Sequence, residues 1–135
     1  QRLPMIHYRS GYKYKLACYA AVDPIPVPDF EHDYFKVKSG TLIAYKGYAW
    51  DGPSGPTIDT KSFMRGSLVH DALYQAMREG LLDRSYREKA DQILYDLCRA
   101  DGMSRFRAWY VYRFVRMFGA KNVLPSASRP VLTAP

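Results

Sequence analysis

The segment His70-Asp71-Ala-Leu-Tyr74 carries three polar side chains whose types and spacing could perform acid-base chemistry. It lies in a stretch with helical periodicity, where residues four apart share a face. His70 and Tyr74 therefore point the same way, and Asp71 is turned by about 100° toward a neighbouring quadrant. A histidine base and a carboxylate ligand could thus face one pocket from this helix. A single histidine on an amphipathic helix is also commonly a structural hydrogen-bonding group.

Asp91 lies in a second predicted helix, beside the apolar positions Ala90 and Leu94. A carboxylate buried there without a partner would be strongly destabilising or would become protonated. A histidine or a metal ion from the facing helix would supply the partner, and His70 is the nearest candidate. Arg87, one turn earlier on the same helix, is the alternative partner.

A loop precedes the first of these helices and has the sequence Gly47-Tyr-Ala-Trp-Asp-Gly-Pro-Ser-Gly-Pro56. Its three glycines and two prolines exclude regular structure. Gly52 and Gly55 allow backbone carbonyls or amides to turn inward, and Asp51 adds a carboxylate. The loop and the two helices therefore define the candidate site. In a purely structural interpretation, Asp51 only caps its own turn.

Three helices are predicted to position these residues. A helical period covers residues 62–80, and the pattern Ser85-Tyr-Arg-Glu88 is a capping box that predicts a second helix to about Arg99. Because the link between them is short, these two helices should be antiparallel neighbours. A third helix is expected between Ser104 and Gly119.

The first fifty residues have β-type patterns. Ring-rich or β-branched runs predict short strands at residues 12–22, 34–37 and 41–45. Ser39-Gly40 predicts a hairpin turn, and the alternating prolines of residues 23–28 predict an extended spacer. We therefore expect an α+β fold in which an N-terminal antiparallel sheet of short strands is followed by the glycine- and proline-rich loop and three α-helices.

The length of 135 residues predicts a single domain, over residues 1–123, with a flexible tail over residues 124–135. Cys18 and Cys98 match no metal-ligand or redox spacing, although one disulfide between them stays open. No apolar run approaches the roughly 20 residues that span a bilayer, and the N-terminus lacks the layout of a signal peptide. These features predict a soluble protein.

The chain is basic, with 20 Lys and Arg against 13 Asp and Glu, a formal charge of +7. The segment from Met103 to Asn122 contains no acidic residue and five basic ones, Arg105, Arg107, Arg113, Arg116 and Lys121. This excess indicates an anionic partner, such as lipid headgroups, cell-envelope polymers or nucleic acid. We expect the four arginines to bind an anionic surface, although arginines on a helix most often form a solvated face.

Four blocks of sequence, in this order, resemble the domain-of-unknown-function 1353 family: residues 47–56, Arg65-Gly-Ser-Leu-Val-His-Asp-Ala-Leu-Tyr74, Arg87-Glu-Lys-Ala-Asp91 and Val115-Arg-Met-Phe-Gly119. The resemblance covers residues 30–120. The family is found in tailed phages, prophages and bacteria. The resemblance therefore implies a phage or prophage association, and it implies little about activity.

A weaker resemblance is to the core of the phospholipase A2 superfamily, particularly its bacterial members. It rests on an Asp-Gly-x-Ser loop, a His-Asp-x-x-Tyr helix and an antiparallel helix that bears an aspartate. This resemblance implies that His70 deprotonates a water, that Asp91 orients His70 and that Tyr74 supports the network. It implies a calcium site formed by the loop and the aspartate after the histidine, with the ligands Asp71, Asp51, Gly52 and Gly55. The cysteines that flank the superfamily's histidine are absent from this chain.

The calcium chemistry is also coherent without common ancestry. Calcium takes six to eight oxygen ligands, and one carboxylate with loop carbonyls and waters is a sufficient set. In a competing interpretation, a transition ion is held as in metal-dependent phosphohydrolases, by His70, Asp71, Asp91 and Asp51 together.

Two hypotheses of different class follow. The first is a small calcium-type hydrolase, similar to phospholipase A2, that acts on a lipid or another anionic ester of the cell envelope. The second is a non-catalytic phage or prophage component, associated with the virion or with lysis, that binds other phage proteins and uses the polar cluster structurally. Nucleic acid is the less favoured partner in both. In either case we expect the protein in the bacterial cytoplasm or in association with the virion.

Overall fold

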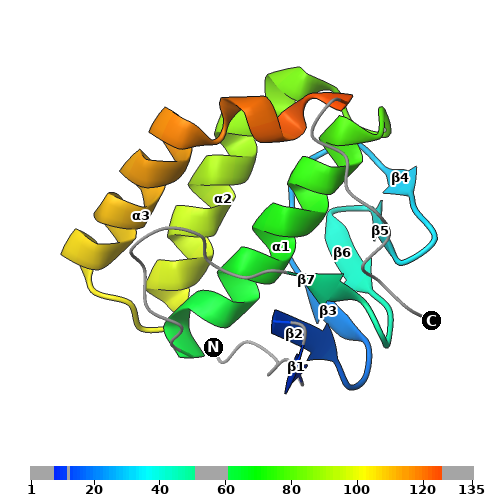
Figure 1. The fold of residues 1–135 in the computed structure, drawn as a ribbon, viewed down its shortest axis with the longest axis horizontal. Helices are drawn as coiled ribbons and strands as arrows, with labels where there is room; N and C mark the ends of the chain where they lie inside the picture. Colours follow the sequence, from blue (N-terminus) through cyan, green and yellow to red (C-terminus); the bar gives the residue numbers. More distant parts are fainter. Residues whose placement is uncertain (1–7, 12, 51–60, 126–135) are drawn as a thin grey trace. The chain divides into compact units, whose positions relative to one another are not determined.

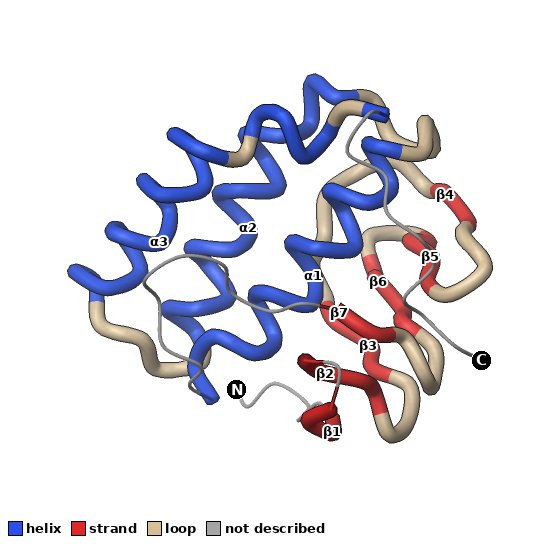
Figure 2. The backbone as a smooth tube through the Cα atoms, in the orientation of Figure 1, coloured by secondary structure: helices blue, strands red, loops and turns tan. Residues whose placement is uncertain are grey.

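The computed structural model describes residues 8–11, 13–50 and 61–125. These residues form two compact units, a β unit over residues 8–50 and a helical unit over residues 61–125, and each is described by itself (Figure 1). Strands occupy the N-terminal half and helices follow, so the α+β fold class is confirmed (Figure 2). The one-domain organisation over residues 1–123 and the flexible tail stay predictions.

The β unit contains seven short strands in two antiparallel sheets. The strands are β1 (Tyr8–Gly11), β2 (Lys13–Leu16), β3 (Ala20–Val22), β4 (Phe30–Glu31), β5 (Phe35–Lys38), β6 (Thr41–Ala44) and β7 (Ala49–Trp50). One sheet has the order β1-β2-β7 and the other has the order β3-β6-β5-β4. The spacer of residues 23–28 forms no strand, as its alternating prolines predict.

The core of the β unit is rich in aromatic rings. The rings of Phe35 and Tyr48, both fully buried, meet edge to face with centroids 5.3 Å apart. Trp50 stacks on Tyr48 and also contacts Tyr14. Aromatic pairs in these arrangements add stability beyond the area that they bury. Part of the chain's high tyrosine content is therefore structural.

The predicted hairpin joins β5 to β6 through the two residues Ser39 and Gly40. Both have positive φ, 52° and 80°, and Lys38 pairs directly with Thr41. These values define a type I′ turn, whose twist matches that of the strands on either side. The turn prediction is therefore confirmed.

Replacing Gly40 by alanine should lower the free energy of unfolding by about 1 kcal/mol, because a non-glycine residue is strained at this φ. A Cβ placed at Gly40 meets no atom within 4 Å, so the loss would come from the backbone alone. Chemical denaturation would measure it. The control is Ser39→Gly, which relieves the same kind of strain and should leave stability equal or raise it. A stability loss in the control, with none in Gly40→Ala, would contradict the assigned turn.

The helical unit contains three α-helices and two short 3₁₀ turns. These are α1 (Lys61–Arg78), η1 (Arg84–Tyr86), α2 (Arg87–Ala100), α3 (Arg105–Phe118) and η2 (Ala120–Val123). Helix α2 lies between α1 and α3 (Figure 1). Arg65 near the start of α1 bonds Asp101 just beyond the end of α2, whereas Tyr74 meets Arg87 at the other end of α2. The first two helices are thus antiparallel, as predicted.

The ends of the helices follow local sequence signals, with one exception. Ser104 caps α3 by accepting a hydrogen bond from the Arg107 amide at 3.2 Å, and α3 ends at Gly119. The capping box predicted at Ser85 is wrong. Asp83 accepts from the Ser85 amide at 2.9 Å and starts η1, so Ser85 lies inside that turn and α2 begins only at Arg87.

Apolar side chains from all three α-helices and from the link between α2 and α3 form a compact cluster. Its buried members are Phe63, Leu94, Cys98, Met103, Ala108 and Val111. Helices α1 and α2 approach closely at Gly66, where an added Cβ would lie 3.0 Å from Leu94 Cδ1 and 3.1 Å from Cys98 Sγ. This close approach brings the polar residues of the two helices within hydrogen-bonding distance.

Candidate functional site

His70 and Asp91 form a direct hydrogen bond between α1 and α2. His70 is 7% exposed and Asp91 is fully buried, and His70 Nε2 lies 2.7 Å from Asp91 Oδ1. The prediction of this contact is confirmed. It arises because the two antiparallel helices place these positions opposite each other, where neither polar group could be buried alone.

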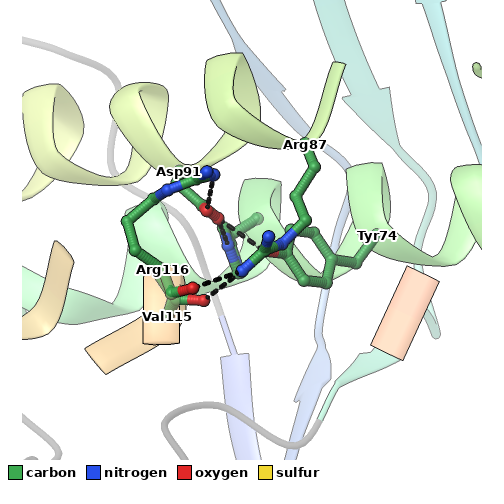
Figure 3. A network of polar contacts seen from close by, with 6 residues as sticks. Tyr74, Arg87, Asp91, Val115 and Arg116 are labelled. Carbon is green, nitrogen blue, oxygen red and sulfur yellow. Dashed lines mark hydrogen bonds and ion pairs between the residues drawn. The ribbon is translucent and has the colours of Figure 1, made fainter. Parts of the chain in front are cut away.

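Asp91 accepts from two further side chains. The Tyr74 hydroxyl donates to Oδ1 at 2.6 Å, and an Arg116 guanidinium nitrogen donates to Oδ2 at 2.8 Å. Tyr74 is one turn beyond His70 on α1, and Arg116 reaches over from α3 (Figure 3). Both oxygens of the buried carboxylate therefore have partners, and three helices meet at one residue.

The direction of each proton in this network can be assigned. Arg87 Nε donates to the Tyr74 hydroxyl at 3.1 Å, so the hydroxyl proton of Tyr74 is directed to Asp91. An ionised carboxylate only accepts, and therefore His70 must donate from Nε2. In the tautomer that donates from Nε2, the lone pair of the ring is on Nδ1. That nitrogen has no hydrogen-bond partner within the part of the chain that the structure describes.

The electrostatics agree with this assignment. Burial alone would raise the pKa of the Asp91 carboxyl, but hydrogen bonds from His70, Tyr74 and Arg116 hold that pKa below its ordinary value. Burial and the Asp91 charge raise the pKa of Tyr74. Burial opposes the charge on Arg116, but Asp91 raises the pKa of that guanidinium. At neutral pH the network therefore contains an aspartate anion, a neutral phenol and an arginine cation.

Arg87 connects this network to the end of α3. Besides Tyr74, it donates to the backbone carbonyls of Val115 at 2.9 Å and Arg116 at 2.7 Å (Figure 3). Both carbonyls belong to the last turn of α3, where carbonyls commonly lack partners within the helix, although the Val115 carbonyl also accepts from the Gly119 amide. The alternative in which Arg87 is the partner of Asp91 is therefore wrong. Arg116 fills that place.

Gly119 allows α3 to end against Tyr74. A Cβ at this position would lie 2.6 Å from the Val115 carbonyl oxygen and 2.8 Å from the Tyr74 hydroxyl oxygen, both closer than real contacts. Gly119→Ala should therefore displace Tyr74 and lower the free energy of unfolding by about 1–3 kcal/mol. Thermal unfolding would measure this loss.

A double variant tests whether Tyr74 is the residue displaced. Tyr74→Phe removes the hydroxyl that the new methyl group would meet. The double variant should therefore lose less stability than the sum of the losses in the two single variants. Strictly additive losses would contradict the contact. Tyr95→Phe makes the same chemical change on α2 and serves as the matched control, because the network does not include Tyr95.

The other predicted site residues have different positions. Asp71 is half-buried on α1, directly after His70. Asp51, Gly52 and Gly55 lie outside the described residues, so the metal-ligand roles predicted for them stay predictions. Arg105, Arg107 and Arg113 are exposed on α3. Arg116, grouped with them in the sequence, has instead an internal partner in Asp91.

The described residues also bear on metal binding and on cysteine chemistry. Among residues 8–11, 13–50 and 61–125, no group of three His, Cys, Asp or Glu side chains is placed to hold a metal ion. Asp91 has both oxygens engaged, one with an arginine, so its arrangement does not suit a metal ligand. Cys18 and Cys98 are free thiols, and burial raises the pKa of Cys98 to about 12. Cys98 therefore stays protonated and is no thiolate nucleophile.

The fold and site define a small α+β protein with a buried histidine and aspartate pair held by three helices. The family model described as "Protein of unknown function (DUF1353)" matches residues 29–115, and the chain belongs to this family. No curated protein and no solved structure matches the chain significantly. In the described segments, no helix is both long and apolar enough to cross a membrane.

Proposed function

We propose that this protein is a calcium-assisted hydrolase of a lipid or another anionic ester, in which His70 is the general base. The observation that carries the proposal is the orientation of the His70 ring. Nε2 is hydrogen-bonded to a buried, ionised aspartate, so Nδ1 is the nitrogen that can accept a proton. A histidine that acts as a base in an enzyme has this arrangement. A partner on one ring nitrogen fixes the tautomer, and the other nitrogen is left for the substrate or water.

The protein's side chains would act in two steps. His70 Nδ1 accepts a proton from a water as the water oxygen bonds to the ester carbonyl carbon. The imidazolium that forms keeps its Nε2 proton on Asp91, whose negative charge stabilises it. When the carbon to alkoxide bond breaks, the proton on Nδ1 passes to the leaving oxygen. The products are an acid and an alcohol, and His70 is neutral again.

Tyr74 and Arg116 would act as positioning residues for Asp91. Each holds one carboxylate oxygen, so the carboxylate cannot rotate away from His70. Arg87 in turn holds the Tyr74 hydroxyl. Such outer contacts fix the geometry of a base without touching the substrate.

The donor types of the proposed ligands would suit a calcium ion. Asp71 follows His70 directly and offers carboxylate oxygens, while Asp51 and the backbone of Gly52 and Gly55 are expected to add further oxygens. An all-oxygen set suits calcium rather than a softer ion. Bound there, calcium would polarise the ester carbonyl and stabilise the oxyanion.

A second candidate function is a non-catalytic phage or prophage component. It is favoured by the way in which the same network ties together the ends of three helices, with Arg87 fastened to two carbonyls of α3. Contacts of this kind also stabilise a protein that performs no chemistry.

Calcium titration tests the metal part of the proposal. Calcium at about 100 times its dissociation constant should stabilise the wild type by about 2.7 kcal/mol, and Asp71→Asn should abolish the rise in melting temperature. The matched control is Asp96→Asn, on the exposed side of α2, which should keep the full rise. Hydrolysis of anionic esters should stop on chelation. If calcium stabilises neither the wild type nor Asp96→Asn, and hydrolysis is insensitive to chelator, the proposed calcium role is wrong.

A further inference from the structure

We propose that the outward face of α3 docks onto an anionic lipid bilayer. This α3 outer face consists of residues that repeat at helical spacing on the side opposite the buried Ala108: Phe106, Tyr110, Arg113, Phe114 and Met117. Phe106 is 72% exposed, Met117 61% and Tyr110 43%. Trp109 and Phe118 flank the face and are also more than half exposed.

The amount of apolar surface on α3 is unusual for a helix that faces water. Only Ala108 and Val111 are buried in this helix, so its largest apolar side chains point outward rather than into the core. A contiguous exposed apolar patch of this kind marks a site of interaction with a protein or a membrane. The rings also contact one another. The ring centroids of Phe114 and Phe118 lie 4.9 Å apart, and those of Phe106 and Trp109 lie 6.4 Å apart.

The charge of α3 selects the occupant. Arg105, Arg107 and Arg113 are exposed beside the rings, and no acidic residue occurs between Met103 and Asn122. A second copy of the chain docked on the same face would bring like charges together. An anionic bilayer instead offers phosphates to the arginines and an acyl boundary to Phe106 and Met117.

The aromatic types also fit the boundary between headgroups and acyl chains. Tryptophan and tyrosine have an apolar body with a polar tip, and both are enriched at that depth. The Arg113 guanidinium lies 5.9 Å from the centroid of the Trp109 ring, a position for a cation-π contact. Double-stranded nucleic acid has phosphates too, but its phosphate surface offers nothing apolar to Phe106 or Met117.

Docking by α3 goes beyond the proposed hydrolysis, because binding requires no chemistry. The two would nevertheless be linked through the helix itself. Arg116 extends from α3 to Asp91, and two carbonyls of α3 bind Arg87. A bilayer that holds α3 would therefore hold the helix that positions the aspartate.

Sedimentation of the full chain with vesicles tests the proposal. The wild type should bind vesicles of phosphatidylglycerol and phosphatidylcholine in equal parts and should not bind phosphatidylcholine alone. Replacing Phe106, Tyr110 and Met117 together by serine should weaken binding about tenfold or more. Replacing Arg105 and Arg107 by glutamine should weaken it about 25-fold at low salt, because each arginine contributes about fivefold.

Two controls separate docking from unspecific effects. Leu81→Ser removes an exposed apolar side chain outside α3 and should leave binding unchanged. Trp109 is 51% exposed and Trp50 only 3%, so a blue shift of tryptophan emission on binding should disappear in Trp109→Phe. Because sedimentation measures no hydrolysis, its failure and the failure of the proposed function are distinguishable.

Three outcomes would overturn the proposal. One is equal binding to neutral and anionic vesicles, or to neither. Another is undiminished binding by the triple serine variant, since charge alone would then explain the attraction. The third is a concentration-dependent dimer that the triple variant abolishes, in the absence of vesicle binding, because the occupant would then be a second copy of the chain.

Discussion

Asp91→Ala is expected to lower the free energy of unfolding by about 3–5 kcal/mol, the usual cost of breaking a buried charge pair by removing one partner. The carboxylate is fully buried and accepts from three side chains. In the variant, the buried polar groups of His70 and Tyr74 lose their hydrogen-bond acceptor, and Arg116 loses its counter-ion. A loss of this size is a large fraction of the stability of a small domain.

Chemical denaturation of the wild type and the variant measures this loss. Asp96→Ala is the matched control, because Asp96 lies on the exposed side of the same helix, where it accepts from Gln92. Its substitution should change stability by less than about 0.5 kcal/mol. Equal losses in the two variants would show that the Asp91 network contributes little.

The pH dependence of this difference follows from the lowered pKa of Asp91. A carboxyl whose pKa is lower in the folded state contributes stability that is present above its unfolded value, about 3.9, and is lost as pH falls through the folded pKa. The stability gap between the wild type and Asp91→Asn should therefore be full at neutral pH and should narrow in acid. A gap that widens in acid would contradict the assigned ionisation.

The secondary structure was predictable because its signals are local. The turn at Ser39 and Gly40 lies between β-patterned runs, and α3 is bounded by a serine cap and a glycine. The start of α2 was mispredicted for an equally local reason. The Asp83 carboxylate accepts the hydrogen bond of the Ser85 amide and starts a 3₁₀ turn there. The capping-box pattern begins at Ser85 and does not include Asp83.

Part of the site was predictable from helix geometry. Spacing placed His70 and Tyr74 on one face, and a short link made the two helices antiparallel, so His70 and Asp91 could be paired. Arg116 could not be paired in this way, because it lies 25 residues from Asp91 in a run of arginines that resembles a solvated face. A count of lone pairs would have helped, since a buried carboxylate needs more donors than a histidine and a tyrosine supply.

The role of Arg87 was missed because its partners are backbone carbonyls, which carry no sequence signal. Gly119 offered an indirect signal. A glycine that ends a helix is usually explained by the helix end alone. Here it also makes room for the Tyr74 ring, and only the packing of two distant segments reveals this.

The second large effect is expected on catalysis. His70→Ala should lower kcat/KM for an anionic ester by about 10²–10⁴-fold, the usual contribution of a positioned general base. His70→Gln is the sharper variant. Its amide nitrogen can still donate to Asp91, so the helices keep their contact, but neither amide atom can accept the proton of water as a base. Both variants should therefore lose activity, and the glutamine variant should keep more stability.

In the proposed mechanism, His70 is a base and not only a structural partner of Asp91. The most direct test of this role is the release of fatty acid from phosphatidylglycerol vesicles, in calcium, by equal amounts of folded wild type, His70→Gln and Ser67→Ala. Ser67 lies on the same helix and donates to the Met64 carbonyl. We expect release by the wild type and by Ser67→Ala, and a loss of about 100-fold or more in His70→Gln. Equal background release by all three proteins would contradict the proposed mechanism.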